Sequence, residues 1–595
     1  MITPKIQILM ALGVALGVVQ AGPIDNNHGN KPTFNNKATC TSQQCVITAA
    51  GIINDMDPAV DPCQDFSKFT CGGFHETHEV PAGKPSIGPF DLLRDGNARI
   101  LRLIVDPSLG KAPKAPAGDV AAQRNIKKLQ DLFTSCMDEA AILKAGRKPL
   151  VDEIHKLVKS LSASGAHPDK KTLAKALGQI AQYGFQTPGF IKLEARVDYD
   201  NPAANVLTIY ENGLGLWNER DYKDAGKVKE YQGTIAAMLQ TILGDEDVTN
   251  RAQPLTSKDI NKEWTDAAKD IVDFEVQIAA INTPQSDLWD STKNKNPRTI
   301  DQLNALIPAI DWSVFFKEAF PLGLKYTDPI IVSSLPYLTK LDTLLQKTSS
   351  RTLQRYFSWV LIRSLSGNLA QPYKQPKTNF DNMSSGTSPN TKTERWTTCL
   401  AIADKNLVHI TGHYFVKTTF KGDSRQEVLK IVDNVIASYE KTFPTLSWLD
   451  KKTREGALKK LRAIVKTVGY STSNPDDVSA NSLDAFYKGY KVVEKDHFGN
   501  QLRYMRWATA SEFAQLPLPV DREALGDMSL TTVNAHYYPV YNAIHIPAGI
   551  LQLPFFNIEN PENVNYGSMG VVGHEIGHAF DNSGRHYDAS GRLAN

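Results

Sequence analysis

A stretch near the end of the chain, residues 571–581, constrains the fold most, because it contains the pattern H-E-x-x-H. On a helix, His574 and His578 lie four residues apart and project from one face, about one turn apart. Two imidazoles at this spacing bind one Zn²⁺, which lowers the pKa of a bound water to about 7. Glu575 lies within reach of that water and accepts its proton. The stretch predicts a helix with His574 and His578 as zinc ligands and Glu575 as general base.

The same pattern also occurs by chance on ordinary surface helices, because it fixes only three positions. Its neighbours favour a packed helix, since Val572, Ile576 and Phe580 can face a core while the histidines face a cleft. The stretch by itself leaves both interpretations open, and the rest of the chain has to decide between them.

The composition is that of a folded protein and excludes several classes. The chain has 595 residues, of which 41% are hydrophobic and 22% charged, so it is long enough for two or more domains and too apolar for intrinsic disorder. The net charge of +2 gives no electrostatic reason to bind nucleic acid or an anionic membrane. We therefore expect no nucleic-acid partner.

Residues 1–21 are predicted to be a secretory signal peptide. Lys5 supplies a positive charge, residues 6–19 are almost entirely apolar, and Val19-Gln20-Ala21 suits signal peptidase. The alternative, a signal anchor, is disfavoured because a spanning helix needs about 20 apolar residues. The sequence therefore predicts a secreted, extracellular protein without a membrane anchor.

Residues 22–60 predict a flexible leader with a small cysteine loop. A helix is expected next, capped by Asp57 or Asp61 and ended by Gly72-Gly73. Apolar residues at three- and four-residue steps predict further helices at 118–145, 150–161, 228–243, 264–281, 338–365, 400–420 and 425–465. Within the last of these ranges, Asp450 is expected to cap and begin an amphipathic helix. Short strands are expected at 206–210 and 330–332.

Two extended segments, 533–538 and 542–551, flank a turn near Pro539. This arrangement predicts a hairpin or an edge strand. An edge strand beside a zinc helix can hold a peptide by backbone hydrogen bonds. The alternative is ordinary sheet structure without a binding role.

A series of motifs runs along the chain in a fixed order. The motifs are Asp61-Pro62-Cys63-x-Asp65-Phe66 with Cys71-Gly72-Gly73, Ser135-Cys136-Met137-Asp138, Trp448-Leu449-Asp450-x-x-Thr453, Asn534-Ala535-His536-Tyr537, Pro547-Ala548-Gly549-Ile550-Leu551-x-x-Pro554-Phe555-Phe556 and Gly573-His574-Glu575-x-x-His578-x-x-Asp581-x-x-Gly584-Arg585. In this order they resemble the motifs of the neprilysin and endothelin-converting enzyme family of zinc endopeptidases. The resemblance covers nearly all of the chain from Cys40 onward.

The resemblance implies a mostly α fold with small β segments, arranged as a two-lobed, neprilysin-like shell around an internal chamber. A stretch rich in Ser, Asn, Asp and Pro at 471–484 predicts the connection between the two lobes. Residues 61–475 would then form a large helical domain, and residues 476–595 a thermolysin-like (gluzincin) catalytic domain with the zinc helix. Such a chamber admits peptides and excludes folded proteins. The implied protein is a secreted zinc-dependent endopeptidase that hydrolyses internal bonds of peptides, with one Zn²⁺ as its cofactor.

The resemblance also implies roles for single residues of the zinc site. His574 and His578 would bind the zinc. Glu575 would activate the attacking water and pass its proton to the leaving amine. Asp581 would orient a ligand histidine from behind.

Two further sets of residues are implied by the same resemblance. Asn534 would hold the substrate backbone through its side chain, and Ala535 would hold it through its main chain. The implied disulfides are Cys40–Cys45 and Cys136–Cys399.

The sequence departs from the family in its zinc ligands and its cysteines. The family's third zinc ligand is a later glutamate, whereas Asp581 and Asp588 are the only side-chain carboxylates after His578 here. Cys63 and Cys71 lack the partners that the family places near its C-terminus, and a bond between these two is not expected, because eight helical residues span about 12 Å. We expect a catalytic domain that is incomplete at its C-terminal end. The alternative is a catalytically inactive, secreted peptide-binding relative.

Overall fold

The computed structural model describes residues 40–594, except for 82, 163–164, 185–188, 246–248, 250–257, 289, 321–328 and 525–527. The expected signal peptide at 1–21 and the leader up to residue 39 lie outside the described residues. In the described part, no helix is long and apolar enough to cross a membrane. The region expected to hold the leader and cysteine loop contains a helix, α2 (Gln43–Asp55), whose first turn is capped by Ser42.

The chain is mostly helical, and its buried apolar side chains gather in three cores. The helices of the first core are α7 (Lys148–Ser162), α8 (Lys170–Ala181), α9 (Ala225–Leu243), α10 (Lys262–Ile281), α12 (Ile300–Leu306), α13 (Trp312–Ala319), α14 (Leu335–Lys347), α15 (Ser350–Leu365), α16 (Gln371–Ser384) and α22 (His497–Phe513). Those of the second core are α4 (Pro89–Val105), α5 (Val120–Met137), α17 (Arg395–Asn406), α18 (Val408–Thr419) and α21 (Ala480–Phe486). Those around the third core are α19 (Ser424–Thr442), α20 (Lys451–Arg462), α23 (Glu562–Ser568) and α24 (Gly570–Gly577). Shorter or peripheral helices are α3 (Phe66–Thr77), α6 (Glu139–Ala145) and α11 (Gln285–Leu288).

Two small sheets complete the described fold. The first sheet has the strand order β1-β2-β4-β3, formed by β1 (Ile191–Val197), β2 (Asn205–Glu211), β4 (Ile330–Val332) and β3 (Asn296–Arg298). The second has the order β5-β7-β6, formed by β5 (Val465–Gly469), β7 (Ala543–Pro547) and β6 (His536–Tyr538). β6 runs antiparallel to β7 and lies at the edge, which confirms the hairpin predicted from 533–538 and 542–551. The strands predicted at 206–210 and 330–332 are also confirmed.

The helices predicted from apolar periodicity are present, but four of them are interrupted. The helix predicted at 118–145 divides into α5 and α6, because the side chain of Asp138 accepts a hydrogen bond from the amide of Ala141 at 3.0 Å and caps a new helix. Ser349 divides the helix predicted at 338–365 in the same way. The segment predicted at 400–420 divides into α17 and α18. The segment at 425–465 divides into α19 and α20, and Asp450 caps α20, which confirms the helix expected to begin there. In three of the four cases both halves pack on the same core, so the apolar periodicity continues across the break.

The helix expected to end at Gly72-Gly73 continues through both glycines. α3 is capped by Asp65 rather than by one of the earlier aspartates. Both glycines are buried where α3 meets the C-terminal end of α2, and a Cβ on Gly73 would lie 2.2 Å from the carbonyl oxygen of Asn54. The pair therefore permits a close approach of two helices instead of ending one of them.

We expect Gly73→Ala to destabilise the α2–α3 pair by about 1–3 kcal/mol, because the added methyl overlaps the backbone of α2. Gly51→Ala on α2 is the matched control. Nothing lies within 4 Å of a Cβ at Gly51, so this variant should stabilise its helix by about 0.5–1 kcal/mol. Hydrogen–deuterium exchange of the α2 and α3 amides measures both effects. Equal protection in the two variants would contradict the proposed close packing.

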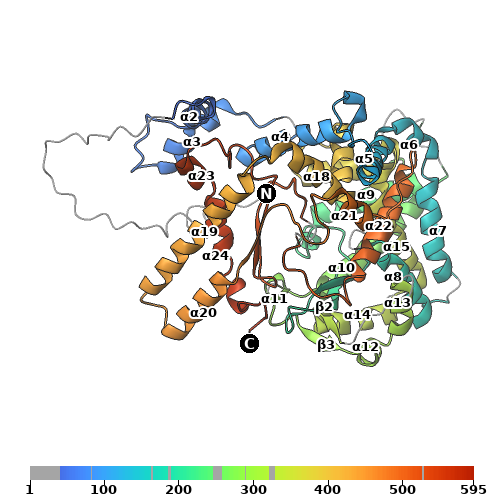
Figure 1. Ribbon diagram of the computed structural model, residues 1–595. Coiled ribbons are helices and arrows are strands. Elements are labelled where there is room, and N and C mark those ends of the chain that lie inside the picture. Colours follow the sequence, from blue (N-terminus) through green and yellow to red (C-terminus); the bar gives the residue numbers. More distant parts are fainter. Residues whose placement is uncertain are drawn as a thin grey trace, which may run out of the picture.

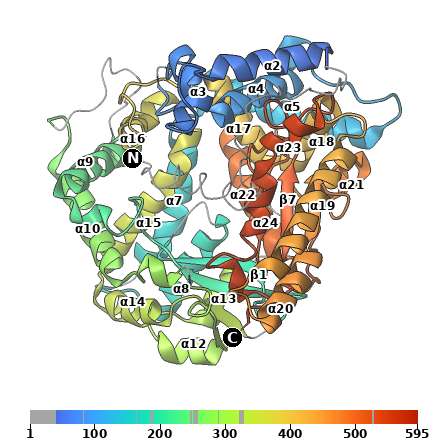
Figure 2. The same ribbon diagram turned by 90° about the vertical axis from the view of Figure 1, so that its left-hand side faces the viewer.

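The helices form a two-lobed shell, as the resemblance implied (Figures 1 and 2). In Figure 1, α19, α20 and α24 lie on one side of the molecule and α7, α8, α13 and α15 on the other, with α4 crossing above them. The third core joins segments from both sides of residue 475, since it contains Val428 and Leu461 as well as Ile544 and Ile576. The H-E-x-x-H motif at 574–578 therefore belongs to the lobe that contains α19, α20 and the second sheet.

Two disulfides are present among the described residues. Cys40–Cys45 closes a short loop at the start of α2, and Cys136–Cys399 joins α5 to α17 over a sequence separation of 263. These are the two pairs that the resemblance implied. Cys63 and Cys71 are free and exposed.

Candidate metal centre

Helix α24 presents the two histidines of H-E-x-x-H on its outer side. Val572 and Ile576 are fully buried in the third core, which fixes the rotation of the helix. His574 on the other side is exposed. α24 ends at Gly577, and His578, half-buried, keeps helical backbone angles as its C-terminal cap. The spacing of the motif and the apolar residues around it therefore suffice to place both imidazoles on one side.

The two imidazoles converge on one point. Nε2 of His578 lies 3.0 Å from Nε2 of His574. Two nitrogens that bind one zinc tetrahedrally at about 2.0–2.1 Å lie about 3.3 Å apart. Together with Glu575, the two histidines form a group whose ligand atoms all lie within 4.8 Å of one another. This donor set fits a zinc ion held by two imidazole nitrogens.

Asp581 holds the ring of His578 from behind. Its Oδ2 lies 2.8 Å from Nδ1 of His578, and its Oδ1 accepts hydrogen bonds from the amides of Ser583 and Gly584 at 2.8 and 2.7 Å. Partial burial opposes ionisation of Asp581, but these hydrogen bonds outweigh it and hold the pKa of the carboxyl below its usual value. An ionised Asp581 accepts a hydrogen bond from Nδ1–H of His578. This favours the tautomer of His578 in which Nε2 has no proton and its lone pair can bind a metal.

Glu575 is buried and held by the edge strand. Its side chain is 4% exposed, and the backbone amide of Tyr537 donates to its Oε2 at 2.9 Å. Burial raises the pKa of Glu575 to about 7, against the opposing effects of His578 and the Tyr537 amide. The contact with Tyr537 was not predicted, because a backbone amide is common to all residues and carries no sequence signal of its own.

Asn534 and Ala535 lie directly before the edge strand β6. The side chain of Asn534 is exposed, whereas Ala535 is buried. β6 pairs with β7 on one side, and on its other side the amide of Tyr537 meets Glu575 of α24. The fold thus brings the Asn534-Ala535 segment close to the histidine motif, although about forty residues separate them in the sequence.

Only Glu575 joins the two histidines in the ligand group that the described residues form. Asp581 bonds to Nδ1 of His578, on the opposite edge of the ring from Nε2. Asp588 accepts hydrogen bonds from the amides of Ser590 and Arg592 at 2.8 and 3.0 Å within its own turn. Neither aspartate is therefore placed as a third metal ligand.

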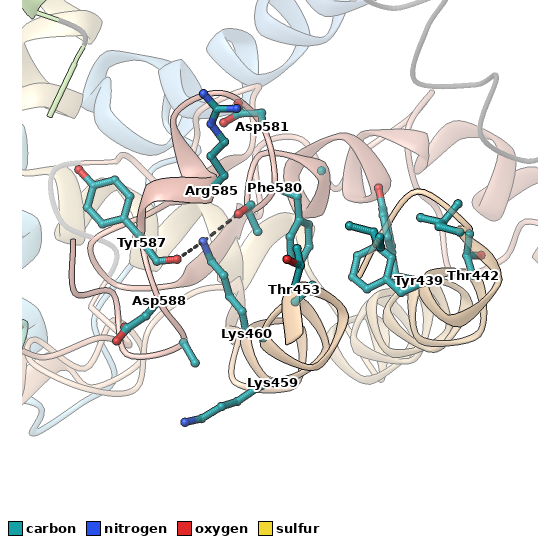
Figure 3. A pocket seen from close by; sticks show the side chains of 18 of the residues that line it. Tyr439, Thr442, Thr453, Lys459, Lys460, Phe580, Asp581, Arg585, Tyr587 and Asp588 are labelled. Atoms are coloured by element: carbon teal, nitrogen blue, oxygen red, sulfur yellow. Dashed lines mark hydrogen bonds between the residues drawn. The ribbon is translucent and has the colours of Figure 1, made fainter. Parts of the chain in front are cut away.

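A cavity of about 1350 Å³ lies beside α24, between α19, α20 and the segment that follows His578 (Figure 3). Its lining is mainly apolar and includes Tyr439 and Phe580. Gly573 and Gly577 contribute the side of α24 that faces it, whereas the two motif histidines do not line it. The cavity is therefore distinct from the metal-binding face.

Comparisons with known proteins agree with this geometry. Models of peptidase family M13 match residues 62–471 and 534–595. Rat endothelin-converting enzyme 1 is 32% identical over 560 residues, which cover 93% of this chain and 69% of the relative. The endothelin-converting enzyme homolog of Locusta migratoria is 28% identical, and the match covers 98% of this chain and 77% of the relative.

A solved structure of similar fold is the zinc metalloprotease Zmp1 of Mycobacterium tuberculosis in complex with an inhibitor. It has a TM-score of 0.77 and 26% identity, and the match covers 91% of this chain and 76% of that chain. The mostly α shell and the zinc metalloendopeptidase class implied by the resemblance are thereby confirmed. On these matches, and with two converging imidazoles beside a buried glutamate, the chain belongs to peptidase family M13, a family of zinc metallopeptidases.

Proposed function

We propose that the protein is a secreted endopeptidase that hydrolyses internal bonds of peptides, with His574 and His578 as zinc ligands and Glu575 as general base. The observation that carries the proposal is the convergence of the two Nε2 atoms, 3.0 Å apart, beside a glutamate that the Tyr537 amide holds. Secretion is supported by the composition of residues 1–21 and by two disulfides, which persist in oxidising compartments.

His574 and His578 would hold the zinc, and Asp581 would keep His578 in the ligating tautomer. When bound, the metal would act as a Lewis acid, which lowers the pKa of the attacking water and polarises the substrate carbonyl. Glu575 removes a proton from the attacking water and delivers it to the nitrogen of the leaving amine. We expect Oε1 to carry this proton, because Oε2 already accepts the hydrogen bond from the Tyr537 amide.

Asn534 and Ala535 would hold the peptide next to this centre, Asn534 through its side-chain amide and Ala535 through its main chain. Support for this role comes from their place before the edge strand, where an extended peptide can add by backbone hydrogen bonds. The division into a large helical domain at 61–475 and a catalytic domain with the H-E-x-x-H helix at 476–595 stays a prediction; the third core contains residues from both sides of residue 475.

A second candidate function is peptide binding without catalysis. It is favoured by one observation: besides Glu575, the proposed base, the ligand group of the described residues contains only His574 and His578, whereas catalytic zinc sites have three protein ligands. Such a protein would bind peptides through the β6 edge and leave them intact. Peptide cleavage by the 595-residue chain that depends on stoichiometric zinc would exclude this candidate.

Removal of zinc with 1,10-phenanthroline is expected to lower the cleavage rate of an internally quenched peptide at least 100-fold, and one equivalent of Zn²⁺ should restore it. The physical reason is that, without the metal, the pKa of the attacking water is no longer lowered. The control is 1,7-phenanthroline, an isomer that cannot chelate. Full activity after dialysis to zinc-free protein would contradict the metallopeptidase mechanism, and zinc binding without cleavage would favour the second candidate.

A further inference from the structure

Lys460 on α20 is a buried lysine that the zinc chemistry does not use. It is 5% exposed, and its Nζ donates hydrogen bonds to the carbonyl oxygens of Ala579, Gly584 and Tyr587 at 2.8, 2.6 and 2.7 Å. An ammonium has three N–H donors, and these three carbonyls satisfy all of them. In Figure 3 the side chain reaches from α20 into the segment between Asp581 and Asp588.

The three carbonyls belong to one loop, residues 579–587, which begins directly after His578. Gly584 lies against the end of the zinc helix, since a Cβ on it would stand 1.8 Å from the carbonyl oxygen of His578. The amide of Gly584 in turn bonds to Asp581, the residue that holds His578. Lys460 therefore fixes this loop at its start, its middle and its end, on both sides of Asp581.

The same turn of α20 is also tied to the strand that holds Glu575. The side-chain amide of Asn542 donates to the carbonyl of Lys460 at 3.1 Å and to that of Ala589 at 3.0 Å. Its Oδ1 accepts a hydrogen bond from the hydroxyl of Tyr537 at 2.8 Å. Asn542 is buried with a positive φ of 43°, which an asparagine tolerates better than most residues. The last turn of α20 thus contacts the loop that follows His578. Through Asn542 it is also connected to Tyr537, whose amide donates to Glu575.

We propose that Lys460 is a positioning residue of the metal centre: it holds loop 579–587 so that Asp581 keeps His578 in its metal-binding orientation. The proposal rests on the proposed function of His574 and His578 as zinc ligands. A merely structural lysine would stabilise the lobe without affecting metal affinity. A positioning lysine changes metal affinity in protein that stays folded, because partners behind a ligand histidine tune its binding.

The test measures zinc affinity by competition with a chelator of known affinity, in the full chain and at one pH. Lys460→Met removes the ammonium and keeps the length of the side chain. Lys459→Met is the matched control, since it makes the same change at the adjacent, exposed position of α20. We expect Lys460→Met to bind zinc about 10–100-fold more weakly than the parent and Lys459→Met to bind it equally well.

A double-mutant cycle with Asp581→Asn identifies the route of the effect. If Lys460 acts through Asp581, the double variant binds zinc no more weakly than the single variant with the lower affinity; additive losses would overturn the proposal. Parent-like zinc affinity in folded Lys460→Met would overturn the proposal while leaving the zinc site intact. Failure of the parent chain to bind zinc would instead overturn the proposed function.

Lys460→Met is checked for a cooperative thermal melt before its affinity is interpreted. Should it not fold, Lys460→Arg replaces it, because this variant keeps a cation among the carbonyls. A planar guanidinium cannot bring one nitrogen to all three carbonyls, so the loop shifts and zinc affinity should still fall several-fold. Parent-like affinity in the arginine variant would then overturn the proposal.

Discussion

Glu575→Gln is expected to lower kcat for peptide cleavage about 1000-fold, because a positioned general base contributes roughly 10²–10⁴ to the rate and an amide cannot accept the proton. The variant should keep its zinc. Glutamine has the same shape as glutamate, and its side-chain carbonyl can still accept the hydrogen bond from the Tyr537 amide. The measurement is kcat and KM on an internally quenched peptide, with zinc content determined on the same samples.

Glu562→Gln is the matched control for this variant. Glu562 lies on α23, beside the zinc helix, where its carboxylate is exposed and pairs with Lys430 at 2.8 Å. The same loss of charge there should leave kcat unchanged. Parent-like cleavage by Glu575→Gln would refute its role as base. Loss of zinc together with activity would show that Glu575 acts on the metal site and not on the proton.

Cys136→Ala/Cys399→Ala is expected to lower the free energy of unfolding by about 5 kcal/mol. In the unfolded chain this disulfide closes a loop with a sequence separation of 263, and the entropy that a cross-link removes grows with loop length. Both cysteines are fully buried in the second core, between α5 and α17. Denaturation in guanidinium under non-reducing conditions, followed by far-ultraviolet circular dichroism, measures the change.

Cys40→Ala/Cys45→Ala is the control for loop length. This pair is only five residues apart, so the same relation gives an effect of about 2 kcal/mol. Its effect should be confined to the beginning of α2. Equal shifts in the two double variants would contradict the argument from loop length. No shift for Cys136→Ala/Cys399→Ala would mean that the second core is stable without its covalent link.

Much of the helical part of the fold could be predicted from the sequence, because amphipathic periodicity is a local property. The positions where helices end were harder to predict. Asp138 and Ser349 start new helices inside continuous apolar patterns, and Gly73 continues a helix that it was expected to end. In each case a single contact decides whether the helix ends or continues: a capping side chain at Asp138 and Ser349, and the neighbouring backbone of α2 at Gly73. The spacing of apolar residues does not reveal such a contact.

The sequence by itself determined that His574 and His578 share one side of a helix with Glu575 between them, because the four-residue spacing acts through local helical geometry. Only the tertiary structure decided what holds these groups. The Tyr537 amide reaches Glu575 across 38 residues, and Lys460 reaches the carbonyl of Ala579 across 119. Both contacts use main-chain groups, which every residue carries, so no side-chain pattern marks them until the chain has folded.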